Sequence, residues 1–177
     1  MLKDDCILVI IDFQERLAPH IAGIDRIVKN SVKLIKACKT FGIPMIVTEQ
    51  KKLGKTIDEI EKLLDIKPIQ KSSFSCLREE EFANKLKDTK RCVCILIGIE
   101  AHICILQTAL DLIKEGYIVY VPLDCIGSRN EFDKDVAIRR MVKEGVIPTT
   151  AETLIFEILQ TAEAEEFKEI LKIVKEG

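Results

Sequence analysis

Short, nearly continuous apolar segments alternate along this chain with segments of helical spacing. Cys6–Ile11, Ile43–Val47 and Val93–Ile97 are apolar and rich in β-branched residues, which is typical of strands buried on both faces. Ile24–Phe41 instead repeats its apolar residues at helical spacing and ends at Gly42. This alternation favours a parallel sheet between two layers of helices. We therefore predict a three-layer α/β/α fold with a Rossmann-like, doubly wound and mostly parallel sheet.

The rest of the chain continues the alternation without a linker-like stretch. Further strands are expected at Lys67–Gln70, Tyr117–Leu123 and Val146–Pro148. Further helices are expected at Lys55–Leu64, at Glu79–Lys87 with Ser75 or a neighbour as cap, and at Cys104–Glu115, Glu131–Glu144, a segment through Gln160, and Ala164–Val174. Thr149 with Glu152 three residues later fits a capping box for the helix through Gln160. Residues 1–177 are expected to form a single domain.

Composition excludes several classes of partner. The chain has 177 residues, 47% of them hydrophobic, and a net charge of −2 with acids and bases interspersed. It has no basic cluster of the kind that binds nucleic acid or a membrane surface. The apolar segment near the N-terminus is too short for a signal peptide or a membrane span and ends at Asp12. We expect a cytoplasmic protein with no nucleic-acid or membrane partner.

The seven cysteines are an odd number, and most lie in apolar segments. In a reducing compartment they are expected to be small buried hydrophobes rather than a disulfide framework. Cys92 and Cys94 should share one face of a strand, directed toward the core. Zinc is not expected, because only two histidines accompany them. Two thiols stand apart: Cys104 opens a helix after a strand, and Cys76 is left open between a core and a site role.

Three polar residues follow three of the predicted strands. Asp12 follows the first, Lys71 the third, and Cys104 comes after the turn that ends the fourth. The carboxyl ends of parallel strands share one edge of the sheet, where such folds bind ligands. Taken singly, Asp12 could be a cap, Lys71 a surface charge and Cys104 a core thiol. Together they suit thioester chemistry, because a lysine favours the thiolate and a carboxylate can take and return its proton.

Two histidines offer alternatives. His102 lies two residues before Cys104, but this spacing in a turn does not ensure that ring and thiol meet. His20 lies in a loop and is expected at the surface or rim. We therefore favour the Asp12–Lys71–Cys104 set over a cysteine–histidine pair.

Several segments resemble the isochorismatase-like cysteine hydrolases. They are ILVIIDFQERLAPHI (7–21), IPMIVTEQ (43–50), KSSFS (71–75), IGIEAHICILQTALDL (97–112) and DCIGSR (124–129). They span nearly the whole chain in the family's order. The branch that these segments resemble best is the isochorismatase-domain-containing proteins of unassigned substrate.

The resemblance implies a role for each matching position. Cys104 corresponds to the nucleophile, Asp12 to the acid/base, and Lys71 to the residue that supports the thiolate. Ile99–Glu100 corresponds to a cis peptide bond, and the backbone N–H groups of Glu100 and Cys104 to the oxyanion hole. Family members are usually dimers or larger oligomers.

The resemblance also bears on cofactors and on the pocket. Nicotinamidases of this family hold a metal with histidines after the second strand, and residues 50–71 here contain none. We therefore expect no metal and no cofactor. The residues expected to line the substrate pocket are Phe13, Gln14, Glu49, Gln50 and Phe74, and Phe74 could equally belong to the core.

The sequence supports one leading hypothesis and two alternatives. The first is a metal-independent cysteine hydrolase that cleaves a small amide or carbamoyl-type C–N bond and forms a homo-oligomer. A non-catalytic oligomeric binding or scaffold protein would keep the fold without an activated thiol. A redox-sensing protein would use Cys104 as a sulfenate or disulfide.

Overall fold

The strands form one parallel sheet in the computed structural model, which describes residues 3–176. The strand order is β3-β2-β1-β4-β5-β7, and a short β6 pairs with β4. Every pairing is parallel. The strands are β1 (Cys6–Ile11), β2 (Met45–Gln50), β3 (Ile69–Lys71), β4 (Val93–Ile99), β5 (Ile118–Pro122), β6 (Ile126–Gly127) and β7 (Ile147–Thr149).

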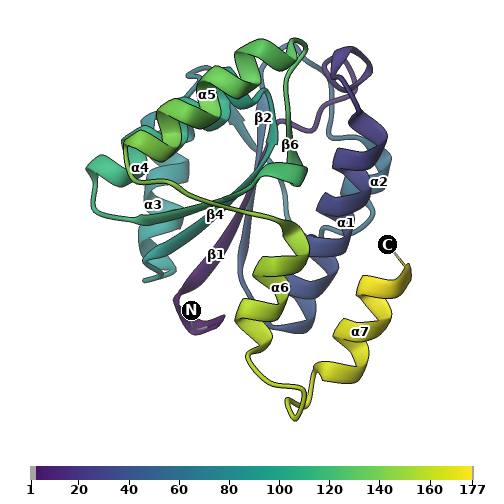
Figure 1. Ribbon diagram of the computed structural model, residues 1–177. Helices are drawn as coiled ribbons and strands as arrows, with labels where there is room; N and C mark the ends of the chain where they lie inside the picture. The colour runs from purple at the N-terminus through teal and green to yellow at the C-terminus, as the bar shows by residue number, and fades with distance from the viewer. Residues whose placement is uncertain (1–2, 177) are drawn as a thin grey trace.

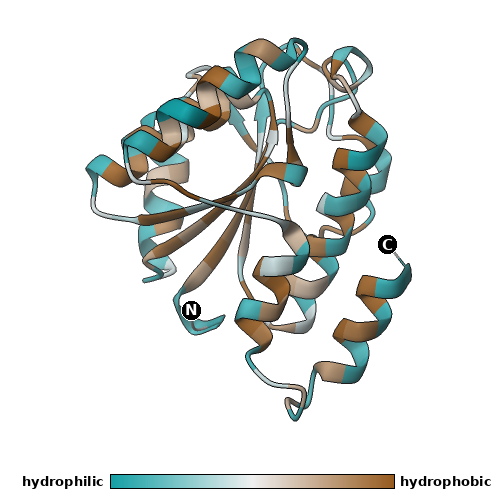
Figure 2. Ribbon diagram, in the orientation of Figure 1, coloured by the Kyte–Doolittle hydropathy of each residue, from teal (hydrophilic) through white to brown (hydrophobic). Residues whose placement is uncertain are grey.

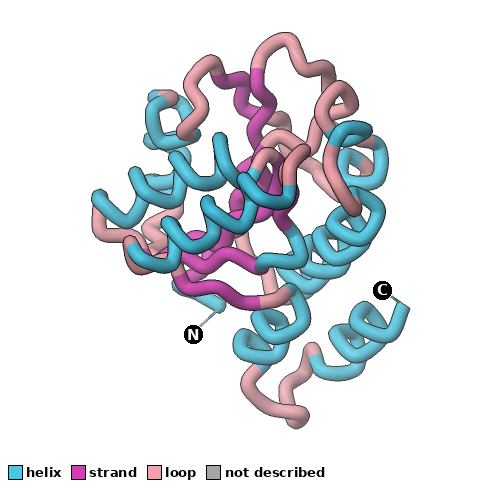
Figure 3. The backbone as a smooth tube through the Cα atoms, turned by 45° about the horizontal axis from the view of Figure 1, so that its top comes forward, coloured by secondary structure: helices cyan, strands magenta, loops and turns pink. Residues whose placement is uncertain are grey.

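Helices cover both faces of this sheet, as Figures 1 and 3 show. One layer holds α1 (Ile24–Thr40), α2 (Asp58–Glu61), α6 (Ala151–Leu159) and α7 (Phe167–Glu176). The other holds α3 (Glu80–Asp88), α4 (Leu106–Lys114) and α5 (Glu131–Lys143). The predicted three-layer, doubly wound architecture is confirmed. Among residues 3–176, no helix combines the length and the apolar character that a membrane crossing requires.

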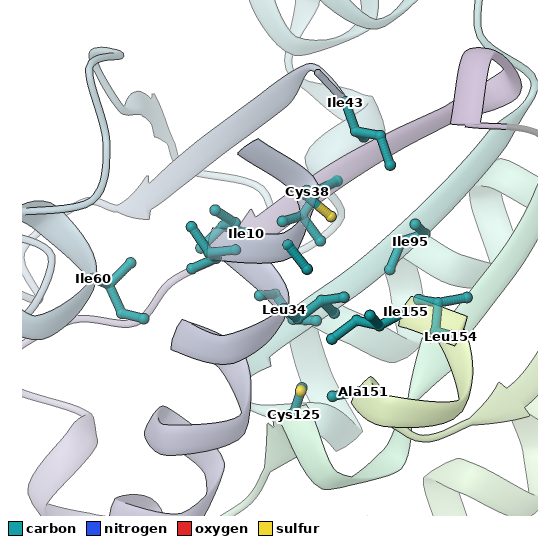
Figure 4. Close-up of a cluster of buried hydrophobic side chains, with 14 of the residues drawn as sticks. Ile10, Leu34, Cys38, Ile43, Ile60, Ile95, Cys125, Ala151, Leu154 and Ile155 are labelled. Carbon is teal, nitrogen blue, oxygen red and sulfur yellow. The ribbon is translucent and has the colours of Figure 1, made fainter. Parts of the chain in front are cut away.

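Strand β1 explains how one apolar segment serves two cores. All six of its residues are completely buried, and alternate side chains point to opposite faces. Leu8 and Ile10 pack in the core beneath α1 and α6. Figure 4 shows Ile10 there, near Leu34 and Ile155. Ile7, on the other face, packs beneath α3 and α4. Figure 2 shows the same arrangement as brown strands between helices of mixed hydropathy.

The capping box predicted at Thr149 is wrong by one residue. Thr149 is the last residue of β7, so the backbone turns only after it. Thr150 is the N-cap of α6, and its Oγ1 accepts a hydrogen bond from the Thr153 backbone N–H at 3.2 Å. Glu152 is therefore the second helical residue and cannot close a capping box, which needs the third.

Other local predictions also needed correction. Cys92 is exposed, because it precedes the first residue of β4, whereas Cys94 is buried within the strand. Helix α3 begins after Glu79 without a side-chain cap, and Ser75 instead precedes the short 3₁₀ turn Cys76–Arg78. Strand β6 has only two residues and was not predicted, because so short a segment leaves no periodic pattern.

The order of the strands creates a switch point between β1 and β4. From β1 the chain builds outward through β2 and β3, and it then returns to add β4 on the other side of β1. Crossovers therefore leave β1 and β4 in opposite directions, which opens a crevice beyond their carboxyl ends. Asp12 directly follows β1, and Glu100 directly follows β4.

Candidate active site

Asp12 leaves the sheet in a left-handed backbone conformation, with φ of 53°. Its neighbour on β4 is Gly98, which pairs with Ile11 and has φ of 140°. A Cβ atom at position 98 would lie 2.0 Å from the Ile11 carbonyl oxygen. Only glycine allows the two strand ends to approach this closely. Gly98 thus lets the chain turn sharply at Asp12, whose side chain is completely buried.

Lys71 ends β3 and is also completely buried. Its Nζ lies 2.7 Å from Asp12 Oδ2 and donates to Gln50 Oε1 at 2.6 Å. It also donates to the backbone carbonyls of Ser73 and Phe74, each at 3.3 Å. A buried ammonium requires an opposite charge and oxygen acceptors, and this cage supplies both. Lys71 is therefore held in one position relative to Asp12.

Cys104 lies in a single π-helical turn, η4 (Ala101–Ile105), that leads into α4. This turn spaces its backbone hydrogen bonds one residue wider than an α-helix does, as in the bond from Ile105 N–H to Glu100 carbonyl at 3.3 Å. Such turns are frequent at functional sites. Cys104 is 6% exposed, and Lys71 Nζ donates to its Sγ at 3.4 Å. The structure thus brings Asp12, Lys71 and Cys104 together around one ammonium group.

The charges around Cys104 act in opposite directions on its thiol. Burial raises the pKa of Cys104, the Asp12 carboxylate raises it further, and the Lys71 ammonium lowers it. The net effect is a pKa well above its ordinary value, so the resting group is a thiol. The sequence led us to expect a thiolate favoured by Lys71. Burial and the carboxylate outweigh that contribution because desolvation disfavours the charged form.

The same contacts determine the charge on Lys71. Burial lowers the pKa of Lys71, but Asp12 raises it, as do Cys104 and Cys76. The result is a pKa above the ordinary value, so the ammonium is retained at neutral pH. A thiol, a carboxylate and an ammonium in contact can move a proton from sulfur to oxygen while the cation offsets the charge that develops on sulfur.

Thr48 and Cys76 complete the surroundings of Asp12. Thr48 Oγ1 donates to Asp12 Oδ1 at 2.9 Å, and it lies 3.8 Å from Cys76 Sγ. The Cys76 backbone N–H donates to Thr108 Oγ1 at 3.0 Å. Sequence reasoning gave Thr48 no role, although its place after the second strand put it at the correct edge. Cys76, which was left open, lies beside the site rather than in a remote core.

Two glutamines connect the loops around Lys71. Gln14 is completely buried, and its Nε2 donates to the backbone carbonyls of Gln50 and Gly54 at 2.9 and 2.7 Å. Its Oε1 accepts from the Gln50 backbone N–H at 2.8 Å. Gln50 uses Oε1 for Lys71 and Nε2 for the Ser72 carbonyl. Both glutamines therefore hold the segments around the Lys71 ammonium in place.

The other residues named for the pocket occupy different surroundings. Both carboxylate oxygens of Glu49 accept hydrogen bonds, Oε1 from Thr56 at 2.7 and 2.8 Å and Oε2 from Gln70 at 2.6 Å. Phe13 is 1% exposed and packs in the core beneath α1. Phe74 is 52% exposed, in the loop whose carbonyls hold Lys71, so it does not belong to the core.

Glu100 begins the turn that carries the thiol. The Ile99–Glu100 peptide bond is cis. The Glu100 side chain is 4% exposed and forms an ion pair with Arg129, and His102 Nδ1 lies 3.2 Å from its Oε2. His102 Nδ1 also lies 2.9 Å from Ser128 Oγ. The ring of His102 is thus engaged with Glu100 and Ser128.

Within residues 3–176, no group of three or more histidine, cysteine, aspartate or glutamate side chains is arranged to hold a metal ion.

Comparison with known proteins identifies related chains. Residues 6–153 match the isochorismatase domain. Isochorismatase domain-containing protein 2A of Mus musculus is 35% identical over 182 residues, which cover 99% of this chain and 85% of the mouse protein. These matches confirm the resemblance drawn from the sequence motifs.

Solved structures agree with this relationship. The structure named MAR1 ribonuclease from Caenorhabditis elegans has 35% sequence identity and a TM-score of 0.92, covering 99% of this chain and 92% of the other. The YcaC gene product of Escherichia coli, described as an octameric hydrolase of unknown specificity, has 21% identity and a TM-score of 0.89 over 99% of this chain and 95% of its own. The second likeness shows the fold alone.

Proposed function

Because this chain belongs to the isochorismatase family of hydrolases, we propose that it is a single-domain, metal-independent cysteine hydrolase. The proposed reaction cleaves a small amide or carbamoyl-type C–N bond through a thioester on Cys104. One observation carries the proposal: Lys71 Nζ lies between Asp12 Oδ2 at 2.7 Å and Cys104 Sγ at 3.4 Å, inside a buried cluster. A purely structural cluster does not require a thiol beside an ion pair.

The first half of the reaction forms the thioester. Asp12 accepts the Cys104 proton as sulfur bonds to the substrate carbonyl carbon. The negative charge that develops on the carbonyl oxygen is met by the backbone N–H groups of Glu100 and Cys104. The C–N bond then breaks, and Asp12 returns its proton to the leaving nitrogen. An oxyanion donor of this kind contributes about 10²–10³ in rate.

The second half of the reaction releases the product. Asp12 removes a proton from water, and the resulting hydroxide attacks the thioester carbon. The C–S bond breaks, a carboxylic or carbamic acid leaves, and the Cys104 sulfur recovers its proton from Asp12. Lys71 keeps its proton throughout, offsets charge on the sulfur and holds the carboxylate in place. General acid–base transfer of this kind contributes about 10²–10⁴.

Assembly and compartment are part of the same proposal. We propose a cytoplasmic homo-oligomer that acts on a small molecule. Members of the family that the sequence motifs resemble are usually dimers or larger oligomers, which supports an assembly of several copies. The net charge of −2 supports a small substrate over a polyanionic one.

Ribonuclease activity is a second candidate, because a structure 35% identical to this chain carries that name. RNA binding depends on cationic surface that neutralises phosphates, and acids outnumber bases here by 29 to 27. Cleavage of a fluorescent RNA by the wild-type protein, lost in Cys104→Ala, would favour this second candidate over the amide hydrolase.

A substrate screen tests the primary proposal. Ammonia release is measured from a panel of small amides and carbamoyl compounds with wild-type protein, Cys104→Ala and the matched control Cys94→Ala. Cys94 is also a buried thiol, in β4, and it has no contact with Asp12 or Lys71 among the hydrogen bonds and ion pairs of residues 3–176. We expect turnover in the wild type and in Cys94→Ala, and none in Cys104→Ala. Equal turnover in all three proteins would overturn the proposal.

A further inference from the structure

Helix α5 presents an unusual line of side chains to solvent. Phe132, Val136, Arg139 and Lys143 are spaced by four, three and four residues, so they share one side of the helix. Phe132 is 70% exposed and Val136 38%, and Arg139 and Lys143 are exposed as well. We refer to these four residues as the α5 face. Figure 1 shows α5 beside α4 at the periphery of the molecule.

The opposite side of α5 already has its own packing partners. Ala137 and Met141 are buried, at 2% and 1% exposure, in the core shared with α4. The exposed phenylalanine and valine are therefore not needed to hold α5 on the domain. Aromatic residues are enriched at protein–protein interfaces, so Phe132, with Val136 beside it, marks a surface suited to contact with another molecule.

The charges on α5 are divided between its two halves. The exposed charges of the first half are the acids Glu131, Asp133 and Asp135, with Lys134 half-buried among them, and those of the second half are the bases Arg139, Arg140 and Lys143. This order also suits the helix dipole, which favours acids at the start and bases at the end. The dipole gives no reason, however, for exposed apolar residues between the two groups. The acidic half of one α5 is therefore complementary in charge to the basic half of a second α5 that runs in the opposite direction.

We propose that the α5 face is the interface with a second copy of this chain, with the two α5 helices antiparallel across a twofold axis. The acidic half of each helix then lies against the basic half of the other, whereas a parallel arrangement would oppose like charges. Phe132 of each copy lies against the Lys143 side chain of the second copy, whose methylenes and ammonium both favour an aromatic ring.

The proposed interface lies close to the site that carries Cys104. Helix α5 contacts the turn η4 as well as α4, and the loop before it supplies Arg129 to Glu100. The inference extends the homo-oligomer proposed above to a named surface. The test of this interface measures assembly alone. The interface proposal can therefore fail while the hydrolase proposal stands, and the hydrolase proposal can fail while the interface proposal stands.

Two charge variants test the arrangement. Arg139→Glu/Arg140→Glu makes the second half of α5 predominantly acidic, and Asp133→Lys/Asp135→Lys makes the first half predominantly basic. Molar mass in solution is measured by light scattering for each variant alone and for an equimolar mixture. Lys168→Glu/Lys172→Glu is the matched control, because both lysines are exposed on α7, away from α5.

The expected result is a wild-type oligomer whose mass falls about two-fold or more in each α5 variant and returns in the mixture. The α7 control should keep the wild-type mass. Recovery on mixing also shows that each variant is folded, since an unfolded chain cannot supply a complementary helix. Phe132→Ser should lower the mass as well, whereas Phe156→Ser on α6, where Phe156 is 38% exposed, should not.

Three results would overturn the proposal. The first is a wild-type protein that is monomeric in solution. The second is wild-type mass in both charge variants, which would place the interface elsewhere. The third is an equimolar mixture whose molar mass stays at the reduced value that each variant has alone.

Discussion

Lys71 Nζ and Asp12 Oδ2 lie 2.7 Å apart, and neither side chain is exposed to solvent. Lys71 ends β3 and Asp12 directly follows β1, and these two strands are not adjacent because β2 lies between them. Each charge is tolerated in the interior because the other is present. The ion pair therefore connects the ends of β3 and β1 across β2, at the edge of the sheet where Cys104 lies.

Lys71→Met should destabilise the protein strongly. The substitution leaves the Asp12 carboxylate buried without its counter-ion, which costs about 3–5 kcal/mol in proteins with comparable pairs. Urea unfolding of wild type and variant measures the loss. The double variant Asp12→Asn/Lys71→Met removes both charges and should be more stable than Lys71→Met alone. A double variant less stable than Lys71→Met would show that the two groups are not coupled.

Thr48→Val removes the hydroxyl that donates to Asp12 Oδ1 without a large change in volume. Loss of this buried hydrogen bond should cost about 1–3 kcal/mol of unfolding free energy. Because Asp12 is then less well oriented, turnover should fall about ten-fold, which corresponds to 1.36 kcal/mol in the barrier.

Thr56→Val provides the matched control for Thr48→Val. Thr56 is also buried and donates to a carboxylate, that of Glu49, at 2.8 Å. Thr56→Val should lose about as much unfolding free energy as Thr48→Val but keep the wild-type turnover. Equal turnover losses in the two variants would mean that Asp12 orientation has no special importance.

Stability should fall at alkaline pH because of buried thiols. Burial, with a smaller effect of the Asp12 carboxylate, raises the pKa of Cys76 from 9.0 to about 11. The folded state therefore holds this proton more tightly than the unfolded state does. The contribution of Cys76 to the free energy of unfolding is fully present below pH 9. It is lost as the pH rises to about 11, a change of about 3 kcal/mol.

Unfolding free energies across this alkaline range measure the effect. Cys76→Ala should show a shallower decline than wild type between pH 9 and 11, since one of the raised groups is absent. Identical slopes in the two proteins would assign the decline to other groups. Cys94, whose pKa burial raises to about 12, contributes at slightly higher pH in both proteins.

Gly98→Ala should lower the stability of the fold much more than Gly42→Ala. Both glycines have positive φ, 140° and 69°, so each substitution carries a backbone cost of about 1–2 kcal/mol. At Gly42 no atom beyond the adjacent residues lies within 4 Å of the added Cβ, whereas at Gly98 the Ile11 carbonyl oxygen lies at 2.0 Å. Thermal unfolding should show a clearly larger loss for Gly98→Ala, and equal losses would contradict the close approach of β1 and β4.

The sheet and the edge that holds the site could be predicted from sequence, because both depend on periodicity. The six apolar residues of β1 predicted a strand buried on both faces, and each of them is completely buried. Placing Asp12, Lys71 and Cys104 after three parallel strands was enough to expect them at one edge. That the three side chains meet could not follow from strand ends alone.

The details that were missed depend on contacts between distant segments. The hydrogen bond from Thr48 to Asp12 joins residues 36 positions apart. The raised pKa of Cys104 results from burial, which the helix-opening position of a cysteine does not predict. The N-cap at Thr150 depends on where β7 ends, and neighbouring threonines carry equal capping signals.

The most direct test of the account is the rate at which acrylamide, a small neutral amide with an electrophilic carbon, modifies each cysteine. Peptide mass spectrometry compares Cys104 with the exposed Cys92 and the buried Cys94 in wild type and in Asp12→Asn. Because Asp12 can take the thiol proton inside the site, Cys104 should react fastest in wild type and slow to the level of Cys94 in Asp12→Asn. Modification of Cys92 with Cys104 left intact would contradict the assignment of Cys104 as the nucleophile.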